Sequence, residues 1–339
     1  LYMYNIFRKL KYVITGQIGE GAQGVVLKAY DTSNERDVAL KKVYTKRVKD
    51  GVPISVLREF KALQQLKHPN VIELLDAFPV GFDFIMVFEY MPSGLWEVIK
   101  DNDILLNTPQ IKIYMKMLLE GVAYIHGKNI MHRDLKPANL LINENGILKI
   151  ADFGLSRLAW DDVAKPYSHQ VATRWYRAPE LLYGARYYTA SIDMWSVGCI
   201  FGELLNKWPL FPGETDIEQL AIVLRYLGTP TVEVWPDLDS LPDYNKITFP
   251  YNKGVTWDSI VEDAEPEAVD LISHILVYNS SKRLTASEAL QHTYFYTKPY
   301  PSLDNVIKIP SNHKNQVKPK EIDTHTKPTV LFKNLLAIA

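Results

Sequence analysis

Short apolar runs, separated by glycine or polar residues, dominate the first quarter of the chain. These runs cover residues 12–18, 24–30, 38–43 and 85–90. Apolar runs of this length with glycine breaks predict β-strands. Between them, residues 54–66 place Val56, Phe60 and Leu63 at helical spacing, which predicts one amphipathic helix. The pattern therefore predicts a small lobe over residues 12–90, with a mainly antiparallel sheet and one main helix.

Longer segments with helical periodicity follow residue 94. The segment 109–125 has apolar residues on one face, and the segment 192–205 is apolar almost throughout, which predicts a buried helix. Further helices are predicted at 217–227, 268–276 and 287–290. The chain is thus predicted to have an α+β fold of two lobes, with a larger, mainly helical lobe over residues 91–298.

Two terminal segments lie outside the predicted lobes. Residues 1–11 form an N-terminal extension that carries no secretory cleavage pattern. From residue 299 onward, prolines recur among lysine, asparagine and histidine, which predicts an extended or disordered tail over 299–339. The last stretch of this tail, 330–339, is apolar again.

Composition narrows the possible partners. The net charge is −1 over 339 residues, so no bulk field favours nucleic acid or an anionic membrane. The sequence has no run of about 18 apolar residues, so we expect no membrane insertion. The one cysteine, Cys199, excludes an internal disulfide and fits a reducing compartment. It lies in an apolar run, so we expect a buried structural thiol rather than a nucleophile.

Three glycines, Gly19, Gly21 and Gly24, lie between the first two predicted strands. Because glycine has no side chain, backbone N–H groups there can approach phosphate oxygens. A dinucleotide-binding turn of an oxidoreductase would lead into a helix, whereas this one leads into a strand. The sequence therefore favours a loop over nucleotide phosphates. Its predicted nucleotide contacts are Ile18, Gly19, Glu20, Gly21, Ala22, Gln23, Gly24, Val25 and Val26.

Lys41 ends the apolar strand that follows. It could be a solvated lysine at the strand end, like its neighbour Lys42. Alternatively, it contacts the α- and β-phosphates of a nucleotide, with Glu59 on the predicted helix as its counter-charge. The other motifs favour this second interpretation.

An Asp, a Lys and an Asn stand within six residues of each other, at Asp134, Lys136 and Asn139. Asp152, followed by Phe and Gly, comes soon after. Asp134 can accept a proton or orient a hydroxyl, and Lys136 can neutralise charge on a transferring phosphoryl group. Asn139 and Asp152 offer the oxygen ligands that a divalent cation needs. A purely structural role would require four independent coincidences, so we predict phosphoryl transfer.

The segment from Asp152 to Glu180 contains Ser168, which is a candidate for an activating phosphorylation. Three arginines on different elements are candidates to receive the phosphate: Arg58, Arg133 and Arg157. An ordinary loop serine is the alternative. Tyr167 and Thr173 are neighbouring candidates, but we expect Thr173 to hydrogen-bond near Asp134 and Lys136 instead.

Two further charged residues have structural interpretations. Asp193 begins the apolar helix and needs partners, so we expect it to support the backbone of the loop that carries Asp134. Arg283 is expected to form a buried ion pair with Glu180.

These motifs together resemble the eukaryotic protein kinases over about residues 12–297: the glycine loop, Lys41, the run from His132 to Asn139, and Asp152-Phe153-Gly154. The segments 53–59 and 175–180 resemble those of cyclin-dependent kinases. Ala22 in the glycine loop and residues 50–53, 136–139, 216–220 and 238–249 are similar to the cell cycle-related kinase branch of that group.

The resemblance implies a bilobal kinase with ATP and Mg²⁺ as cofactors. It implies a serine/threonine kinase directed to sites followed by proline, with Val171 and Arg177 shaping the pocket for that proline. It also implies adenine contacts through the hinge, with Phe88 behind. Those contacts are Ala39, Glu89, Met91 and Leu141.

The partners implied are protein substrates and a cyclin or other activating subunit. The branch implies phosphorylation of other kinases, a cell-cycle or cilium-related role, and location in the cytoplasm and nucleus with the cilium as a further site. A catalytically weak pseudokinase or scaffold is the main alternative; it should lack Lys41, Asp134, Asn139 or Asp152, and this chain keeps all four. A small-molecule kinase is disfavoured because the segment 152–180 suits a peptide platform.

The chain departs from the group at four positions. Gln23 and Ala22 stand where many relatives carry an inhibitory tyrosine and a threonine, so inhibition by phosphorylation of that loop is not available. Ser168 replaces the usual activating threonine. Gly94 stands where relatives commonly have an aspartate that reaches the nucleotide ribose, so we expect that contact to be lost.

Overall fold

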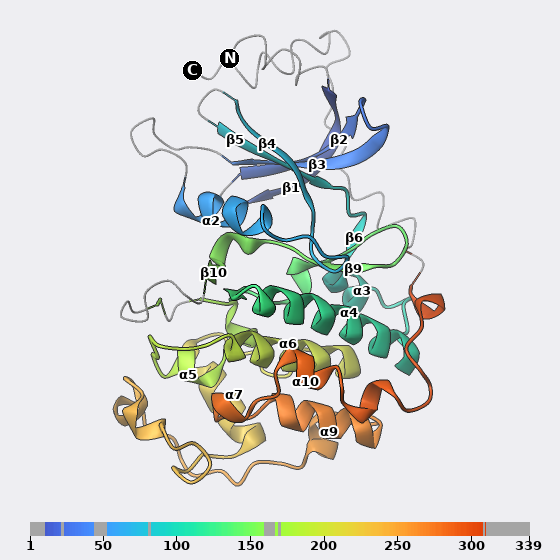
Figure 1. Cartoon of the computed structure of the whole chain (residues 1–339). Coiled ribbons are helices and arrows are strands. Elements are labelled where there is room, and N and C mark those ends of the chain that lie inside the picture. Colours follow the sequence, from blue (N-terminus) through green and yellow to red (C-terminus); the bar gives the residue numbers. More distant parts are fainter. Residues whose placement is uncertain are drawn as a thin grey trace.

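The computed structural model describes residues 11–21, 24–43, 53–80, 83–158, 167–168, 171–307 and 309. In these residues the small lobe contains a five-stranded antiparallel sheet with the strand order β1-β2-β3-β5-β4 (Figure 1). The strands are β1 (Tyr12–Gly21), β2 (Gly24–Asp31), β3 (Arg36–Val43), β4 (Leu74–Val80) and β5 (Asp83–Glu89). The four predicted runs correspond to β1, β2, β3 and β5, and the antiparallel sheet is confirmed.

The sequence pattern missed β4. Its sequence contains Pro79, which cannot donate to a sheet ladder, and Asp76, which breaks the apolar run. The structure accommodates both at the edge of the sheet, where β4 pairs with β5 alone among the described strands and its register shifts between Leu74 and Asp76. An edge position tolerates a proline because one side of the strand needs no ladder partner.

The predicted helix of the small lobe is α2 (Ile54–Leu63), which lies between the sheet and the large lobe in Figure 1. Val56 and Leu63 are buried in the core. Phe60 packs edge-on against Phe84 of β5, with ring centroids 5.7 Å apart. The helix is therefore held mainly by the apolar face that the sequence pattern predicted.

Helices make up most of the large lobe, as predicted (Figure 1). They are α3 (Leu95–Lys100), α4 (Thr108–Gly127), α5 (Pro179–Leu182), α6 (Ser191–Asn206), α7 (Asp216–Leu227), α8 (Trp257–Ile260), α9 (Pro266–Ile275) and α10 (Ala286–Ala289). The helix α4 begins with a capping box, in which the Asn107 side chain accepts from the Gln110 backbone and the Gln110 side chain accepts from the Asn107 backbone. None of the helices in the described residues is long and apolar enough to cross a bilayer.

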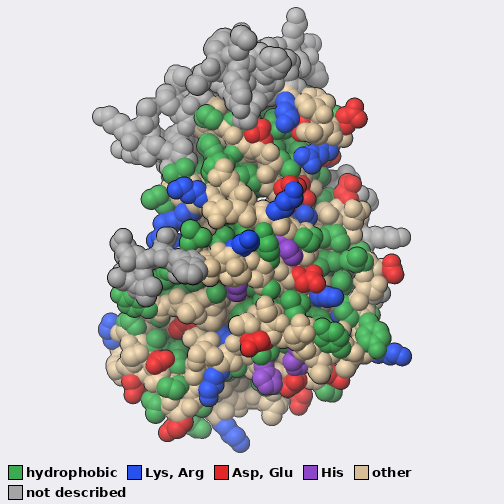
Figure 2. Space-filling model, viewed as in Figure 1, with side chains coloured by type: hydrophobic (Ala, Val, Ile, Leu, Met, Phe, Trp, Pro, Cys, Tyr) green, Lys and Arg blue, Asp and Glu red, His purple; other side chains and the backbone are tan. Residues whose placement is uncertain are grey.

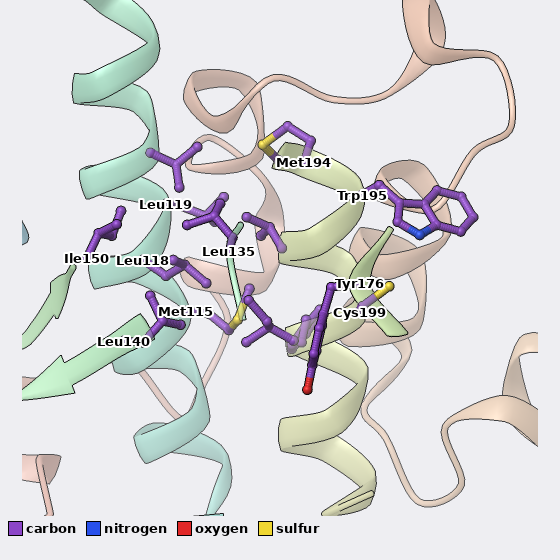
Figure 3. Packing of buried hydrophobic residues seen from close by; sticks show 14 of the residues in the cluster. Met115, Leu118, Leu119, Leu135, Leu140, Ile150, Tyr176, Met194, Trp195 and Cys199 are labelled. Carbon is purple, nitrogen blue, oxygen red and sulfur yellow. The ribbon is translucent and has the colours of Figure 1, made fainter. Parts of the chain in front are cut away.

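The large-lobe core lies between α4 and α6. Figure 3 shows Met115 and Leu118 on α4 directed toward α6, with Leu135 of the intervening loop between the two helices. Cys199 on α6 is 1% exposed, and burial raises the pKa of its thiol well above the ordinary value. The prediction of a buried structural thiol is confirmed.

Short strands, which the sequence pattern did not predict, hold the loops between the lobes. In the described residues, β6 (Ser93–Gly94), β8 (Leu140–Ile142) and β9 (Leu148–Ile150) form one sheet, and β7 (Ile130–Met131) pairs with β10 (Arg157–Leu158). Runs of two or three residues are too short to give a periodic signal. They fix both ends of the segment 132–139 and the start of the segment after Asp152.

The packed body extends beyond residue 298, where the sequence pattern placed the start of the tail. Ile307 and Ile309 are 7% and 9% exposed, and the Ile307 backbone N–H donates to the Tyr114 hydroxyl at 3.2 Å. Val306 packs closely over Gly146. The sequence pattern did not identify Val306, Ile307 and Ile309 as packed residues because they lie in a proline-rich stretch. The predictions for residues 1–10, 308 and 310–339 lie outside the described residues.

Candidate active site

Glycine builds the turn between β1 and β2. Gly21 and Gly24 pair where the two strands meet. A Cβ atom at Gly24 would overlap the backbone carbonyl of Lys42 on β3, so only glycine permits this close approach. Ala22 and Gln23, which we predicted to contact phosphates, lie outside the described residues.

A cavity of about 330 Å³ lies between the two lobes. The predicted residues that line it are Ile18, Gly19, Val26, Ala39, Lys41, Glu59, Phe88, Glu89, Met91, Asn139, Leu141 and Asp152. The cavity is also lined by Ile72, Ala138 and Ala151, which no sequence motif indicated. They are ordinary apolar residues whose position becomes visible only in three dimensions.

Two predicted nucleotide contacts have side chains elsewhere. Val25 is 7% exposed and packs into the small-lobe core, because alternate residues of a strand face opposite sides and Val26 takes the cavity side. The side chain of Val25 therefore faces the core, and a contact of Val25 with the nucleotide stays a prediction. Glu20 is exposed and accepts a hydrogen bond from the Gln17 side chain at 3.2 Å.

Lys41 forms the predicted ion pair with Glu59. Its Nζ atom lies 2.8 Å from both carboxylate oxygens of Glu59 and 3.4 Å from Oδ1 of Asp152. Burial would lower the pKa of Lys41, but these two carboxylates outweigh it and raise the pKa. Lys41 is thus a fixed cation between the small-lobe helix and the Asp152 segment, at the edge of the cavity.

Asp152 adopts a left-handed backbone conformation, with φ at 62°. Phe153 is fully buried, and its ring meets the His132 ring edge-on at 4.8 Å between centroids. Burial would raise the pKa of Asp152, but Lys41 and His132 hold it below the ordinary value. The strained backbone therefore presents an ionised carboxylate to the cavity.

The carboxylate of Asp134 is held from several sides. It accepts hydrogen bonds from the Thr173 N–H at 2.9 Å, from the Thr173 hydroxyl at 3.1 Å and from Lys136 Nζ at 2.8 Å. Lys136 also donates to the Thr173 hydroxyl at 2.7 Å, which confirms the expected place of Thr173. An acid and a cation are therefore fixed next to each other, as phosphoryl transfer to a hydroxyl requires.

Asn139 connects this loop to the cavity that Asp152 also lines. Its Nδ2 atom donates to the backbone carbonyl of Asp134 at 2.8 Å and to Oδ2 of Asp134 at 3.0 Å. This orientation leaves the Asn139 amide oxygen as an acceptor. Together with the carboxylate of Asp152, which lines the same cavity, it forms the all-oxygen donor set that Mg²⁺ prefers.

Asp193 organises the backbone of this loop, as predicted. Its carboxylate is 1% exposed and accepts the backbone N–H groups of His132 and Arg133 at 2.8 Å and 2.7 Å, as well as a contact from His126 Nε2 at 2.9 Å. Burial would raise the pKa of Asp193, but the hydrogen bonds to its charged form lower it. The second expected ion pair is also confirmed: Arg283 contacts both oxygens of Glu180 at 2.7 Å.

Arg177 clamps the backbone beside the acceptor site. Its Nε donates to the carbonyl of Val171 at 2.9 Å and its NH2 to the carbonyl of Ala172 at 3.0 Å. Ala172 has φ at 63°, an unusual value for a residue with a side chain. The third nitrogen contacts both oxygens of Asp216 at 2.9 Å and 3.0 Å. Sequence reasoning found Val171 and Arg177 but missed Ala172 and Asp216.

Ser168 lies near two of the three predicted arginines. Tyr188 donates to the Ser168 carbonyl at 2.7 Å and accepts from Arg133 at 2.9 Å. The guanidinium groups of Arg133 and Arg157 lie 6.0 Å and 5.9 Å from the ring centre of Tyr167. The third arginine, Arg58, lines one cavity with Arg157. The observed contacts reach the Ser168 backbone, so reception of a phosphate on its side chain stays a prediction.

The hinge follows β5. The side chain of Glu89 accepts from Lys149 at 2.8 Å and from the Glu73 N–H at 2.9 Å, and the residue lines the cavity. At Gly94, a Cβ atom would lie 2.6 Å from the Glu97 carboxylate. The space where an aspartate side chain would begin is therefore occupied by Glu97.

The chain belongs to the protein kinase domain family, which it matches over residues 12–295. It is therefore a serine/threonine protein kinase that binds ATP, and the predicted bilobal kinase fold is confirmed. A relative in Danio rerio, Cyclin-dependent kinase 20, is 56% identical over 301 residues, which cover 88% of each chain. Its counterpart in Homo sapiens is 52% identical, over 88% of this chain and 87% of that one. These relatives confirm the resemblance to the cell cycle-related kinase branch.

More distant relatives agree with this assignment. Cyclin-dependent kinase 7 of Xenopus laevis is 44% identical over 87% of this chain and 84% of its own length. Among solved structures, the CAK complex of Chaetomium thermophilum bound to ATP-gamma-S contains a similar chain. That chain is 35% identical, with a TM-score of 0.82 over 89% of this chain and 95% of its own.

Proposed function

We propose that this kinase transfers the γ-phosphate of ATP to serine or threonine hydroxyls that are followed by proline. Asp134 orients the acceptor hydroxyl, and Lys136 and Lys41 stabilise the charge on the phosphates. Mg²⁺, held by Asn139 and Asp152, supplies further charge neutralisation when it is bound. Because the transition state of phosphoryl transfer is loose, this positioning and charge stabilisation provide most of the catalysis.

The clamp of Arg177 carries the proline-directed part of the proposal. Both carbonyls beside the acceptor site, those of Val171 and Ala172, already accept hydrogen bonds from Arg177. A substrate residue that enters this pocket with a backbone N–H would leave that donor without a partner. Proline has no N–H, so it enters without this cost.

Matched peptides test this proposal. They share one sequence and differ only in proline or alanine after the acceptor serine. An unpaired buried donor costs about 1–3 kcal/mol, so we expect kcat/KM to favour proline by about 5- to 150-fold. Arg177→Met frees both carbonyls and should reduce the preference. Equal rates for the two peptides with the wild-type chain would refute proline direction.

We further propose activation by phosphorylation of Ser168 and by a cyclin-type subunit. The approach of Arg133 and Arg157 to Tyr167 supports the first point, since they bring positive charge to the residue next to Ser168. The exposed apolar side chains of Ile54 and Leu57 on α2 support the second point. The similar kinase chain solved within the CAK complex supports a partner subunit as well.

The similarity to Cyclin-dependent kinase 20 supports a wider proposal. We place this kinase in cell-cycle or cilium-related control, with other kinases among its substrates, and in the cytoplasm and nucleus with the cilium as a further site. Affinity purification of the full chain followed by mass spectrometry tests this placement. Recovery of neither a cyclin-type subunit nor any kinase would count against it.

A further inference from the structure

Asp270, His274 and His292 come together on the surface of the large lobe. Asp270 and His274 lie one turn apart on α9, and His292 comes directly before the short helix η7 (Thr293–Phe295). Figure 1 places α9 at the end of the large lobe that is away from the small lobe, and Figure 2 shows histidine side chains beside acidic ones on that part of the surface. The phosphoryl transfer proposed above uses none of these three residues.

The fold holds the segment that carries His292 against α9. Leu271, on the inner face of α9, is 0% exposed, so the helix is anchored in the core of the lobe. The backbone N–H of Leu284 donates to the carbonyl of His274 at 3.2 Å, which attaches the start of the next segment to the end of α9. Phe295 is buried, and its backbone N–H donates to the carbonyl of His292 at 3.2 Å. The three side chains therefore project from a backbone that is held in place.

The donor atoms of the three side chains are close enough to bind one metal ion. One such atom from each side chain lies within 4.8 Å of the other two. Oδ2 of Asp270 lies 2.9 Å from Nε2 of His292, and Oδ1 of Asp270 lies 3.5 Å from Nδ1 of His274. In a tetrahedral zinc site the donor atoms lie about 3.3 Å apart, because each is about 2.0–2.1 Å from the metal. The two observed separations lie on either side of this value.

A bound metal has to replace hydrogen bonds that the rings now make. The backbone N–H of Tyr294 donates to Nδ1 of His292 at 3.2 Å, so a neutral His292 carries its proton on Nε2, where it faces Asp270. Coordination through Nε2 moves that proton to Nδ1 and breaks the contact with Tyr294, which is at the long end of the hydrogen-bond range. Nδ1 of His274 likewise gives up its 2.8 Å contact with the backbone carbonyl of Asp270. Metal–ligand bonds take the place of these contacts.

The chemistry of the donor set indicates which ion fits. Two imidazole nitrogens and one carboxylate oxygen suit Zn²⁺, whereas Mg²⁺ and Ca²⁺ prefer oxygen ligands alone. Asp270 and His274 are exposed, and the side chain of His292 is 13% exposed. An ion can therefore enter from solvent, and water can complete its fourth position.

We propose that Asp270, His274 and His292 bind one Zn²⁺ ion, which joins α9 to the segment that follows α10. The site is distinct from the kinase cleft, and the proposal does not depend on the proposed function. Because the three ligands are brought together only by folding, zinc binds the folded chain in preference to the unfolded one. Its binding therefore stabilises the large lobe.

Calorimetric titration of Zn²⁺ into the full chain, without a histidine tag, tests the proposal. Excess Mg²⁺ is present throughout, because it competes for the oxygen donors of the cleft and not for imidazole. We expect one zinc ion to bind per chain and to raise the unfolding temperature. Asp270→Asn and His274→Gln should each weaken binding by about tenfold or more. Both side chains are exposed, so these variants should fold, and thermal unfolding without zinc checks this.

Co²⁺ supplies a spectroscopic readout of the same site. The wild-type chain should give the visible absorption of four-coordinate Co²⁺, and His292→Gln should lose it. Asp258→Asn removes an exposed carboxylate on α8 and is the matched control, with zinc affinity expected to equal that of the wild-type chain. Asp152→Asn should also keep this affinity, because Asp152 lies in the cleft.

Two results would overturn the proposal. One is the absence of saturable zinc binding to the wild-type chain. The other is an affinity for zinc that is the same in Asp270→Asn, His274→Gln and the wild-type chain, since zinc would then bind elsewhere. In that case Asp270 would serve only as a hydrogen-bond acceptor between two histidines.

Discussion

On the large-lobe side of the cleft, the loop carrying Asp134 is held by buried charge: Asp193 is 1% exposed and binds two backbone N–H groups of the loop. On the small-lobe side, Lys41 depends on Glu59, which sits on α2. That helix has no side-chain cap at its N-terminus. The side chain of Asp152, which Lys41 also contacts, is 49% exposed. The large-lobe half of the active site is thus fixed when that lobe folds, whereas the small-lobe half depends on the position of α2.

This difference shows where regulation can act at low cost. To displace the loop of Asp134, the buried hydrogen bonds to Asp193 would have to break, which would destabilise the lobe. To displace α2, the Lys41–Glu59 contact must break, while the apolar face of α2 can adjust. A partner that binds α2 could therefore raise or lower the activity of the kinase while both lobes stay folded.

The largest effect is expected where the two halves meet. Asp152→Asn removes the charge that contacts Lys41 and that, in the proposed function, holds the divalent cation, so we expect phosphoryl transfer to fall by about 10³-fold or more. The fold should persist, because the side chain is half-exposed. Radiometric peptide assays and thermal unfolding check both statements. Normal activity in this variant would refute the metal assignment.

Substitution of the buried Asp193 tests whether the large-lobe half of the active site is the more rigid one. Asp193→Ala leaves two buried N–H groups without an acceptor, so we expect a loss of about 3–5 kcal/mol in the free energy of unfolding, with activity lost as well. Urea unfolding measures this loss. If stability were unchanged, the large-lobe half would be no more rigid than the other.

Glu59 belongs to the small-lobe half of the active site, where we expect a substitution to affect activity more than stability. Glu59→Gln keeps the shape of the buried side chain and removes its charge, so we expect kcat to fall by about 10- to 100-fold while the free energy of unfolding falls by about 1–3 kcal/mol. The smaller loss of stability is expected because Lys41 keeps its contact with Asp152. A loss of stability as large as that of Asp193→Ala would remove the contrast between the two halves.

A smaller effect is expected at the regulatory site. Ser168→Ala prevents phosphorylation, so the positive charge of Arg133 and Arg157 gains no phosphate partner. We expect activity of the chain isolated from cells to fall by about tenfold. Mass spectrometry of the wild-type chain should find phosphate on Ser168. An unchanged rate, with phosphate present on the wild-type chain, would show that this site does not control the cleft.

The smallest effect concerns acid stability. The pKa of Asp193 is lowered in the folded state, so the unfolded chain binds more protons than the folded chain at acidic pH. Its contribution is present above the unfolded pKa, near 3.8, and is lost as pH falls from about 5 through the folded pKa. Asp193→Asn should reduce the loss of unfolding free energy between pH 5 and pH 3 by at most about 1 kcal/mol, measured by urea unfolding at the two pH values. If the stability of Asp193→Asn and that of the wild-type chain fell equally between pH 5 and pH 3, the lowered pKa of Asp193 would be contradicted.

The candidate catalytic residues could be identified from the sequence because they lie in contiguous motifs whose spacing carries chemical meaning. Asp134, Lys136 and Asn139 fall within one short loop, and the structure brings Asp152 and Lys41 to the same cavity. The fold class followed from strand runs and helical periodicity. The features that the sequence pattern missed have local causes. The strand β4 contains Pro79, and the buried residues Ile307 and Ile309 lie in a proline-rich stretch.

Other parts of the site could not be predicted because they depend on backbone geometry and distant contacts. Nothing in the sequence around Ala172 indicates a left-handed conformation, since alanine is not a residue that favours it. Asp216 reaches Arg177 from a helix about forty positions away in the chain. Such contacts leave no periodic signal, and the proposed proline pocket rests on them.

The burial of Cys199 makes the chain convenient for spectroscopy. It is the only cysteine in the sequence, it is 1% exposed, and its thiol has a raised pKa. A neutral, buried thiol reacts poorly with maleimides and other thiol reagents. One cysteine introduced on the exposed face of α2 would then carry a fluorophore selectively, with no need to remove a native thiol. The movement of that helix toward the cleft could be followed directly in solution.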